Sequence, residues 1–316
     1  MALKEPKIIR NKEEMRNWSR TMRAQGKTIG LVPTMGFLHQ GHLSLITEAQ
    51  KHTHLIVVSI YVNPGQFAVN EDLSTYPSDF AGDIEKLKSI PNGVDVVFNP
   101  QNLYDYGFER EQSGVKKGEK EGGIVSCLED EKGRGIGHET WIRVSELEKG
   151  MCGRSRPVFF RGVATVVAKL FNVIEPDVAV FGKKDYQQWR IIQRMVRDLD
   201  FAVKVIGSEL MRDEDGLAMS SRNVHLSPQE REQALSISRA LFEARSAAKK
   251  GKNICSELRR SMIESIEAAG GKIDYVEIVD QESLETVEDI KNGVVVCVAA
   301  WFGKVRLIDN MEIDAS

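Results

Sequence analysis

The stretch that decides the fold of this chain is residues 28–50, which read TIGLVPTMGFLHQGHLSLITEAQ. Residues 28–34 form an apolar run without alternation, which is typical of a parallel strand that is buried on both faces. A glycine-containing turn follows, and residues 41–52 then show the amphipathic pattern of a helix. This succession places the free N–H groups of the helix start just beyond the end of the strand.

Four further apolar runs repeat the arrangement. They cover residues 55–62, 94–100, 178–182 and 202–207, and helix-like segments at 80–90 and 163–174 lie between them. Strands that alternate with helices predict a parallel sheet with helices on both faces. We therefore expect the α/β class, with a Rossmann-like doubly wound parallel sheet.

The pattern changes after residue 210. Ser227-Pro228-Gln229-Glu230 is a helix start, because it offers a hydroxyl N-cap, a proline at the first helical position and a glutamate that reaches back. That helix is expected to run to about residue 251, and a second one near 254–269 ends at Gly270-Gly271. Strands are predicted at 273–280, 293–302 and 304–310. We expect two domains, 1–210 and a smaller α+β domain at 211–316.

The bulk composition excludes several classes of function. With 316 residues and a net charge of -3, the chain has no general attraction for nucleic acid or for anionic membranes. No apolar segment approaches the roughly 20 residues that span a bilayer, and the N-terminus does not resemble a targeting peptide. The four cysteines, Cys127, Cys152, Cys255 and Cys297, form no C-x-x-C pair, which favours reduced thiols. We expect a cytoplasmic protein.

Residues 107–140 interrupt the α/β pattern. They are rich in glycine and in charges of both signs and contain few large apolar residues, so we interpret them as a mobile surface insertion. The glycines at 133, 135 and 137 are poor evidence for a nucleotide loop, because no strand precedes them and no apolar helix follows.

Two of the six histidines, His39 and His42, stand close together around Gly41. The spacing from Gly36 to Gly41 is that of a phosphate loop, but the lysine and the hydroxyl residue of such a loop are missing. At the positive end of a helix, two imidazoles can donate hydrogen bonds to phosphate oxygens, and Gly41 leaves room for a nucleotide. Two alternatives stay open: one histidine caps the helix while the other packs, or the pair binds zinc, for which a third ligand is missing nearby.

Three more polar motifs accompany the histidines: YVNPGQF at 61–67, FGKKDYQQ at 181–188 and GLAMSSRN at 216–223. The first two directly follow predicted strands, so their side chains should converge with the histidines on one crevice at the carboxyl ends of the sheet. The amides suit a hydroxy acid, the lysine and arginine suit phosphate, and the aspartate suits sugar hydroxyls. Taken alone, the three motifs are more typical of a turn, a solvated helix start and a polar linker, respectively. The candidates they add are Asn63, Gln66, Gly182, Lys184, Asp185, Gln188, Ser220, Ser221 and Arg222.

Together the motifs carry a family resemblance. His39-Gln40-Gly41-His42 resembles the H-x-G-H element of nucleotidyltransferases related to class I aminoacyl-tRNA synthetases, and Met219-Ser220-Ser221-Arg222-Asn223 resembles their second, mobile element. With PTMG, VNPGQF and GKKDYQQ in this order, the chain resembles the pantothenate synthetase (pantoate–β-alanine ligase) family. The resemblance covers nearly the whole chain apart from 107–140, a segment similar to that of plant members.

The resemblance implies a two-step ligation. Pantoate attacks the α-phosphorus of Mg²⁺-ATP to give pantoyl adenylate and pyrophosphate, and β-alanine then displaces AMP to form pantothenate. Residues 211–316 would act as a lid, and the protein would be a homodimer. Both steps depend on positioning and charge stabilisation rather than on a protein nucleophile, which fits the absence of an obvious serine or cysteine nucleophile.

The resemblance also implies roles for individual residues. His39 and His42, the latter as proton donor, and Lys184, Ser220, Ser221 and Arg222 would be catalytic and bind the phosphates of ATP. The rest of the ATP site would comprise Met35, Gly36, Gly41, Gly182, Lys183, Asp185, Met211 and Met219. Pantoate would bind Gln66, Gln188, Met35 and Asn63.

Some points stay open at this level. Lys183 stands where many family members carry glutamate, and we expect its side chain to point to solvent. The magnesium ligands are unknown, because Asp79, Asp83 and Glu85 cannot be ranked from the sequence. The alternative functions are a simple nucleotidyltransferase of the same superfamily and a non-catalytic nucleotide sensor.

Overall fold

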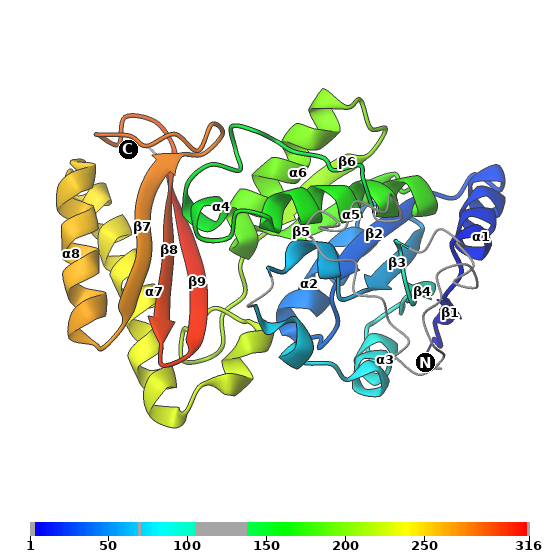
Figure 1. Ribbon diagram of the computed structural model, residues 1–316, viewed down its shortest axis with the longest axis horizontal. Coiled ribbons are helices and arrows are strands. Elements are labelled where there is room, and N and C mark those ends of the chain that lie inside the picture. Colours follow the sequence, from blue (N-terminus) through cyan, green and yellow to red (C-terminus); the bar gives the residue numbers. More distant parts are fainter. Residues whose placement is uncertain (1–3, 69–70, 105–137, 315–316) are drawn as a thin grey trace, which may run out of the picture.

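The computed structural model describes residues 4–68, 71–104 and 138–314 (Figure 1). Its larger sheet has six strands, and every neighbouring pair in it is parallel. In spatial order the strands are β1 (Lys7–Ile9), β4 (Val96–Phe98), β3 (Leu55–Ile60), β2 (Ile29–Thr34), β5 (Val178–Gly182) and β6 (Lys204–Ser208). The strand order reverses between β2 and β5, and this confirms the doubly wound α/β sheet. Ligand crevices of such sheets lie beyond the carboxyl ends of the strands at this point.

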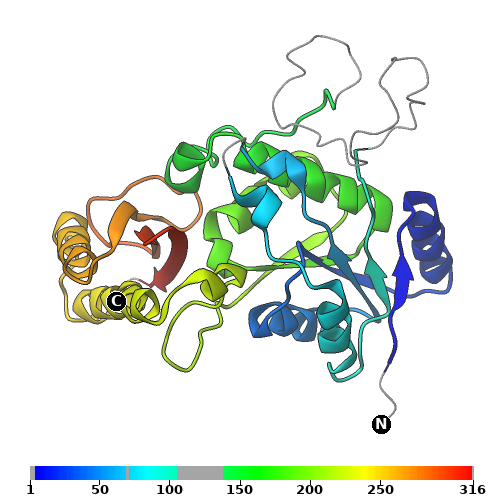
Figure 2. The same cartoon turned by 60° about the horizontal axis from the view of Figure 1, so that its bottom comes forward.

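Helices cover both faces of this sheet (Figure 2). On one face, α2 (Gln40–Gln50) and α3 (Phe80–Lys88) share an apolar cluster with Ile56, Val58 and Ile60 of β3. The intervening Val57 belongs to the cluster of the opposite face. That face is covered by α1 (Lys12–Ala24), α5 (Phe159–Ile174) and α6 (Tyr186–Asp198). Because successive strand residues point to opposite faces, the continuous apolar runs of the sequence are explained by burial on both sides.

The C-terminal part forms a separate antiparallel sheet. Its strands are β7 (Lys272–Asp280), β8 (Val294–Phe302) and β9 (Val305–Ile313), with β8 in the middle. One face of β8 packs under α7 (Pro228–Lys249) and α8 (Cys255–Ala268). The other face, with Val295, Cys297 and Ala299, joins the apolar cluster of the first sheet. The small sheet is therefore docked on the helical side of the first domain, and Figure 1 shows it between its own helices and α4 (Met151–Ser155).

The observed elements agree closely with the expected ones, and the capping box of Ser227 and Glu230 opens α7 as predicted. The sequence pattern did not indicate β1, α1 or α6. Most of the expected insertion, including Cys127 and the glycines at 133, 135 and 137, falls within 105–137, which lie outside the described residues. Across the described residues, none of the helices has the combined length and apolarity needed to cross a membrane.

Candidate active site

The turn after β2 is held by a buried carboxylate from α3. Asp83 is 1% exposed, and its two oxygens accept hydrogen bonds from the backbone N–H groups of Phe37 at 2.8 Å and Leu38 at 2.6 Å. Burial raises the pKa of Asp83 above its ordinary value, although these two hydrogen bonds act in the opposite direction. The turn needs this support because Gly36 and Phe37 both have positive φ angles, of 86° and 52°. Asp83 therefore fixes the direction in which the chain enters α2.

His39 and His42 lie together at the start of α2. His39 occupies the N-cap position, and its backbone N–H donates to Nδ1 of His42 at 3.3 Å. Because Nδ1 of His42 accepts a hydrogen bond, its proton in the neutral ring is on Nε2. The two ring centroids are 4.0 Å apart. As in the capping alternative, one of the two histidines contributes to the helix start, since His42 accepts this hydrogen bond through Nδ1.

Both imidazoles are neutral at physiological pH. Burial, followed by the charge of the Lys184 ammonium, lowers the pKa of His39 from 6.5 to about 4. Burial and the neighbouring His39 hold the pKa of His42 well below 6.5. Among the described residues, the buried Nδ1 of His39 has no hydrogen-bond partner. Neutral rings can donate hydrogen bonds to phosphate oxygens without carrying a charge of their own.

Gly41 makes room for a protein side chain. A Cβ atom at this position would lie 2.9 Å from both Cε1 and Nδ1 of the His39 ring. We expected the glycine to admit a nucleotide, whereas its first structural effect is to let the His39 ring lie across the start of the helix.

The segment after β5 brings an ammonium group to the same place. Lys184 belongs to a short 3-10 turn, Lys183–Asp185, and its Nζ lies 3.8 Å from Oδ2 of Asp185. The neighbouring Lys183 does not point to solvent, and that expectation was wrong. Its Nζ lies 2.7 Å from carboxylate oxygens of both Glu209 and Glu312, so it joins the two sheets through ion pairs.

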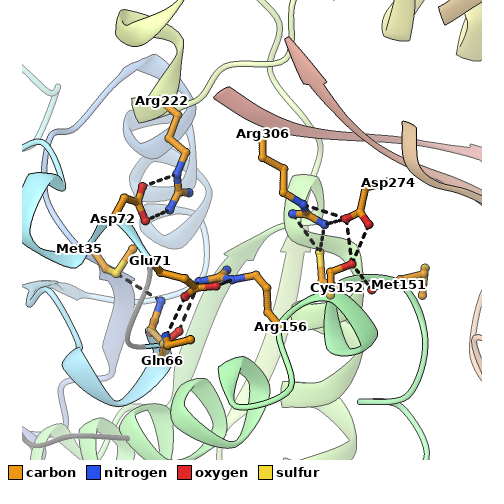
Figure 3. A network of polar contacts seen from close by, with 12 residues as sticks. Met35, Gln66, Glu71, Asp72, Met151, Cys152, Arg156, Arg222, Asp274 and Arg306 are labelled. Carbon is orange, nitrogen blue, oxygen red and sulfur yellow. Dashed lines mark hydrogen bonds and ion pairs between the residues drawn. The ribbon is translucent and has the colours of Figure 1, made fainter. Parts of the chain in front are cut away.

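The turn after β3 presents an amide. Gln66 is 8% exposed, and its Nε2 contacts the sulfur of Met35 at 3.3 Å (Figure 3). Asn63, which is 1% exposed, donates to Oε1 of Gln66 at 3.0 Å and to the carbonyl of Gly162 at 3.2 Å. Both N–H groups of Asn63 are therefore engaged within the protein, and this residue supports Gln66 from behind.

Helix α5 approaches this turn at the level of the main chain. A Cβ atom at Gly162 would lie 2.0 Å from the carbonyl oxygen of Gly65, so only glycine fits here. Gln66 is thus carried by a turn that is pressed directly against a helix backbone.

The two adjacent glutamines at the start of α6 have different surroundings. Gln187 is 6% exposed and is bonded to the backbone of Leu147 at 2.9 Å and Cys152 at 3.1 Å. Gln188 is partly exposed and lines the cleft, and within the described residues its side chain makes no hydrogen bond. Of the pair, Gln188 is the one that is available to a ligand.

The Ser-Ser-Arg segment comes from the connection to the C-terminal sheet. The Ser220 hydroxyl accepts a bond from the backbone N–H of Arg222 at 3.3 Å, and Ser221 donates to the carbonyl of Phe37 at 3.4 Å. The Arg222 guanidinium donates to both oxygens of Asp72, at 2.9 and 3.1 Å (Figure 3). A carboxylate thus occupies the fork that would hold a phosphate in the predicted role.

A second guanidinium lies beside the first. Arg156, just before α5, donates to both oxygens of Glu71 at 2.6 and 2.8 Å and lies 3.8 Å from the ring centroid of Phe159. Sequence reasoning missed Arg156, Glu71 and Asp72. The adjacent acidic pair at 71–72 was a visible signal, but its arginine partners are 85 and 150 positions away along the chain.

All these segments line one cleft between the two sheets. Of the residues predicted for the site, Gly36 and Lys183 do not line it, because Gly36 packs against Asp83 and Ile60 and Lys183 turns toward Glu209 and Glu312. Those that do are Met35, His39, Gly41, His42, Asn63, Gln66, Gly182, Lys184, Asp185, Gln188, Met211, Met219, Ser220, Ser221 and Arg222.

A parallel sheet with neutral imidazoles, an ammonium and guanidinium groups at its carboxyl edge defines an α/β enzyme whose cleft suits anionic substrates. A family model described as pantoate-beta-alanine ligase matches residues 7–312 of this chain. The chain belongs to the pantoate–β-alanine ligase family, and it is an enzyme of the ligase class.

Individual relatives agree with this assignment. The pantoate–β-alanine ligase of Lotus japonicus is 64% identical over 309 residues, which cover 98% of this chain and 99% of that protein. The crystal structure of pantothenate synthetase from Thermus thermophilus is similar with a TM-score of 0.81 and 37% identity, and covers 96% of this chain and 98% of its own. The pantoate–β-alanine ligase of Francisella tularensis, solved with beta-gamma ATP and β-alanine, has a TM-score of 0.71 and 31% identity, and 97% of each chain is covered.

Proposed function

We propose that this chain condenses pantoate with β-alanine to pantothenate at the expense of ATP, through an enzyme-bound pantoyl adenylate. The observation that carries the proposal is the convergence of His39, His42, Lys184 and Arg222 on one cleft that also presents two neutral amides. Family membership and the relative solved with an ATP analogue and β-alanine support it.

In the first step, a carboxylate oxygen of pantoate attacks the α-phosphorus of ATP. An O–P bond forms, the bond from the α-phosphorus to the bridging oxygen breaks, and pyrophosphate leaves with the bonding electrons. The leaving oxygens gain negative charge, which Lys184 and Arg222 neutralise while the hydroxyls of Ser220 and Ser221 donate hydrogen bonds. His39 and His42 donate to phosphate oxygens as neutral rings.

The role of His42 follows from its protonation state. Since the backbone N–H of His39 occupies Nδ1, the proton of His42 lies on Nε2 and is offered as a hydrogen bond. A ring with so low a pKa is neutral at physiological pH, and it takes up the second proton that a general acid needs only after the anionic triphosphate enters the cleft and raises that pKa.

In the second step, the neutral amine of β-alanine attacks the acyl carbon of the adenylate. A C–N bond forms, the C–O bond to the phosphate breaks, the nitrogen loses one proton to the departing phosphate group or to water, and AMP leaves. No protein nucleophile is required, and the site contributes orientation and exclusion of water.

The remaining lining residues fit the rest of the two substrates. Gln66 and Gln188, beside Met35 and above the buried Asn63, would bind the hydroxyls and carboxylate of pantoate. Gly182 and Asp185 would bind the ribose, and the backbone near Met211 and Met219 would contact adenine, with Gly41 at the phosphates.

Magnesium would enter with ATP, mainly on phosphate oxygens and water. Among the described residues, no three His, Cys, Asp or Glu side chains gather as a metal site. Asp79 caps α3, Asp83 holds the 37–38 backbone and Glu85 pairs with Lys88, so the three acidic candidates are engaged elsewhere.

The assembly and the domain division are also proposals. We infer a homodimer from the family resemblance, and a cytoplasmic location from the widely spaced cysteines. Residues 1–210 would hold ATP and pantoate, and 211–316 would supply the covering part. The apolar cluster shared by the two parts of the chain supports a C-terminal sheet that stays docked.

The decisive experiment measures AMP release with ATP plus pantoate, ATP plus β-alanine, and all three, together with pantoate-dependent exchange of labelled pyrophosphate into ATP. We expect exchange with pantoate alone and AMP release coupled to pantothenate only with all three. A simple nucleotidyltransferase would not require β-alanine to finish its reaction, and a sensor would show no exchange.

A pair of lysine variants ties the activity to the cleft. Lys184→Ala should abolish most of the exchange, whereas Lys204→Ala, at the exposed start of β6, should leave it unchanged. Exchange at the wild-type rate in Lys184→Ala would contradict the assigned role.

A further inference from the structure

Asn310 of β9 contacts the main chain of the lysine turn. Its side chain belongs to a residue that is only 8% exposed, and Nδ2 donates to the carbonyl oxygens of Lys183 and Lys184, both at 2.8 Å. Both N–H groups of one amide are therefore used on two successive carbonyls. The turn has no side-chain cap of its own at Asp185, so this contact from the other sheet is a principal anchor.

The residue before Asn310, Asp309, contacts the segment that leads to Arg222. Asp309 is 4% exposed and accepts two hydrogen bonds from the Arg212 guanidinium, at 2.6 and 2.9 Å. Arg212 pairs with Ala218 in a small hairpin, in which the N–H of Met219 also bonds the carbonyl of Met211 at 3.0 Å. This hairpin leads directly into Ser220, Ser221 and Arg222.

Two neighbouring residues on one strand thus hold the lysine turn and the Ser-Ser-Arg segment, which are two of the segments that bring positive charge to the cleft. The Lys183 ammonium and Glu312 also link the two sheets, but they do so through side chains that do not line the cleft. Asn310 differs because it bonds the backbone of Lys184 itself, and it therefore sets the position from which that side chain departs.

We infer that Asn310 is a positioning residue for Lys184, and that with Asp309 it keeps the lysine turn and the Ser-Ser-Arg segment at a fixed separation. The inference rests on the proposed function, in which Lys184 binds the phosphates of ATP. A lysine side chain has four rotatable bonds, so its ammonium reaches the phosphates reproducibly only if its backbone is fixed. A misplacement of roughly 1 Å can cost on the order of 100-fold in rate.

The test is a double-mutant cycle on the full-length chain, measured by pantoate-dependent pyrophosphate exchange. Asn310→Ala should lower kcat of the exchange by roughly 10–100-fold. In the Lys184→Ala background, the same change should cost less than about 3-fold, because nothing is left to position. The KM for β-alanine in the complete reaction should stay within about 2-fold of the wild-type value, since a misplaced ammonium affects the phosphates.

The matched control is Glu312→Gln, two positions along the same strand. It removes an ion pair between the sheets but leaves both carbonyl contacts of Asn310, so exchange should remain within about 2-fold of wild type. Thermal unfolding of each variant separates lost positioning from lost stability. If Asn310→Ala does not fold, Asn310→Ser, which keeps one donor, takes its place in the cycle.

The outcomes are distinguishable. Equal losses from Asn310→Ala with and without Lys184, or wild-type exchange in Asn310→Ala, would overturn the inference while leaving the proposed function intact. If the wild-type chain shows no pantoate-dependent exchange, the proposed function fails, and the same cycle measured on the Kd for ATP decides whether Asn310 acts through Lys184.

Discussion

The 36–42 turn and the 211–222 connection both bring polar side chains to the cleft, but they are held in different ways. In the first, the contacts run to the main chain: Asp83 to the N–H groups of Phe37 and Leu38, and the N–H of His39 to His42. The second is a small hairpin with its own backbone contacts, and ion pairs between side chains, Arg222 with Asp72 and Arg212 with Asp309, attach it to the rest of the protein.

The difference has a chemical meaning. Backbone hydrogen bonds to a buried carboxylate fix one geometry, because releasing them would leave buried groups unpaired. An ion pair between a guanidinium and a carboxylate can be replaced by one between the guanidinium and a phosphate, which has matching geometry. In the proposed function, the first region would be a rigid platform of hydrogen-bond donors, and the second would offer a cation that an arriving triphosphate can take over.

The largest effect is expected at the rigid platform. His42→Ala should lower kcat of adenylate formation by roughly 10²–10³-fold with little change in the KM for pantoate, because a donor to the developing phosphate charge is lost. His52→Ala, at the exposed far end of the same helix region, is the matched control and should be neutral. Single-turnover kinetics measure both, and a normal rate in His42→Ala would show that the platform is only structural.

The second largest effect is expected at Asp83, which holds the turn that carries the histidines. Asp83→Ala leaves two backbone N–H groups without their charged acceptor and should lower the free energy of unfolding by about 2–3 kcal/mol. Asp79→Ala, which removes only the N-cap of the same helix, should cost about 1 kcal/mol. Urea titration followed by circular dichroism compares the two. If both variants lost the same free energy of unfolding, the hydrogen bonds of Asp83 to Phe37 and Leu38 would stabilise the protein no more than an ordinary N-cap.

Acid should weaken the platform specifically. The pKa of His39 is about 4 in the folded chain and 6.5 ordinarily, so between these values the unfolded state binds the additional proton. This contribution to stability is complete above pH 6.5 and is lost as the pH falls to about 4, by at most about 1.4 kcal/mol per pH unit. In His39→Gln, the free energy of unfolding, measured by urea titrations at several pH values in this range, should depend less steeply on pH than in the wild type. An unchanged dependence on pH would argue against a depressed pKa of His39.

The smallest effect is expected at the replaceable ion pair. Asp72→Asn removes the charge that competes with phosphate for Arg222 and should lower the KM for ATP by roughly 2–5-fold, corresponding to about 1 kcal/mol or less. Glu71→Gln, which releases Arg156 instead, should leave the KM for ATP unchanged. Initial rates at low and high salt measure this, and a raised KM in Asp72→Asn would mean that the carboxylate orients Arg222 rather than competing for it.

The sequence predicted the features that depend on local segments, and it did not predict the partners that come from distant parts of the chain. The alternation of apolar runs and helical segments predicted the sheet, and the motifs at the strand ends predicted the residues of the cleft, since strand ends of a parallel sheet meet at one edge. Local chemistry also located the histidine platform. The sequence could not supply Asp72 for Arg222 or Asn310 for Lys184, because such partners depend on how two sheets dock.

Lys183 shows why one expectation from the sequence was wrong. A lysine after a strand is ordinarily solvated, and nothing nearby in the sequence indicates otherwise. Its two carboxylate partners come from the end of β6 and from β9, and only the packing of the C-terminal sheet brings the second within reach.

The contact between Gly162 and the carbonyl of Gly65 bears on how variant libraries of this chain should be interpreted. Every substitution at 162 pushes a side chain into a peptide group, so a saturation screen scored by growth or activity would find this position as intolerant as His42. The intolerance would report crowding between two main chains, and it would appear at a residue that does not itself line the cleft. Substitution tolerance alone would therefore mark a spurious catalytic position, which a measurement of folding yield would remove.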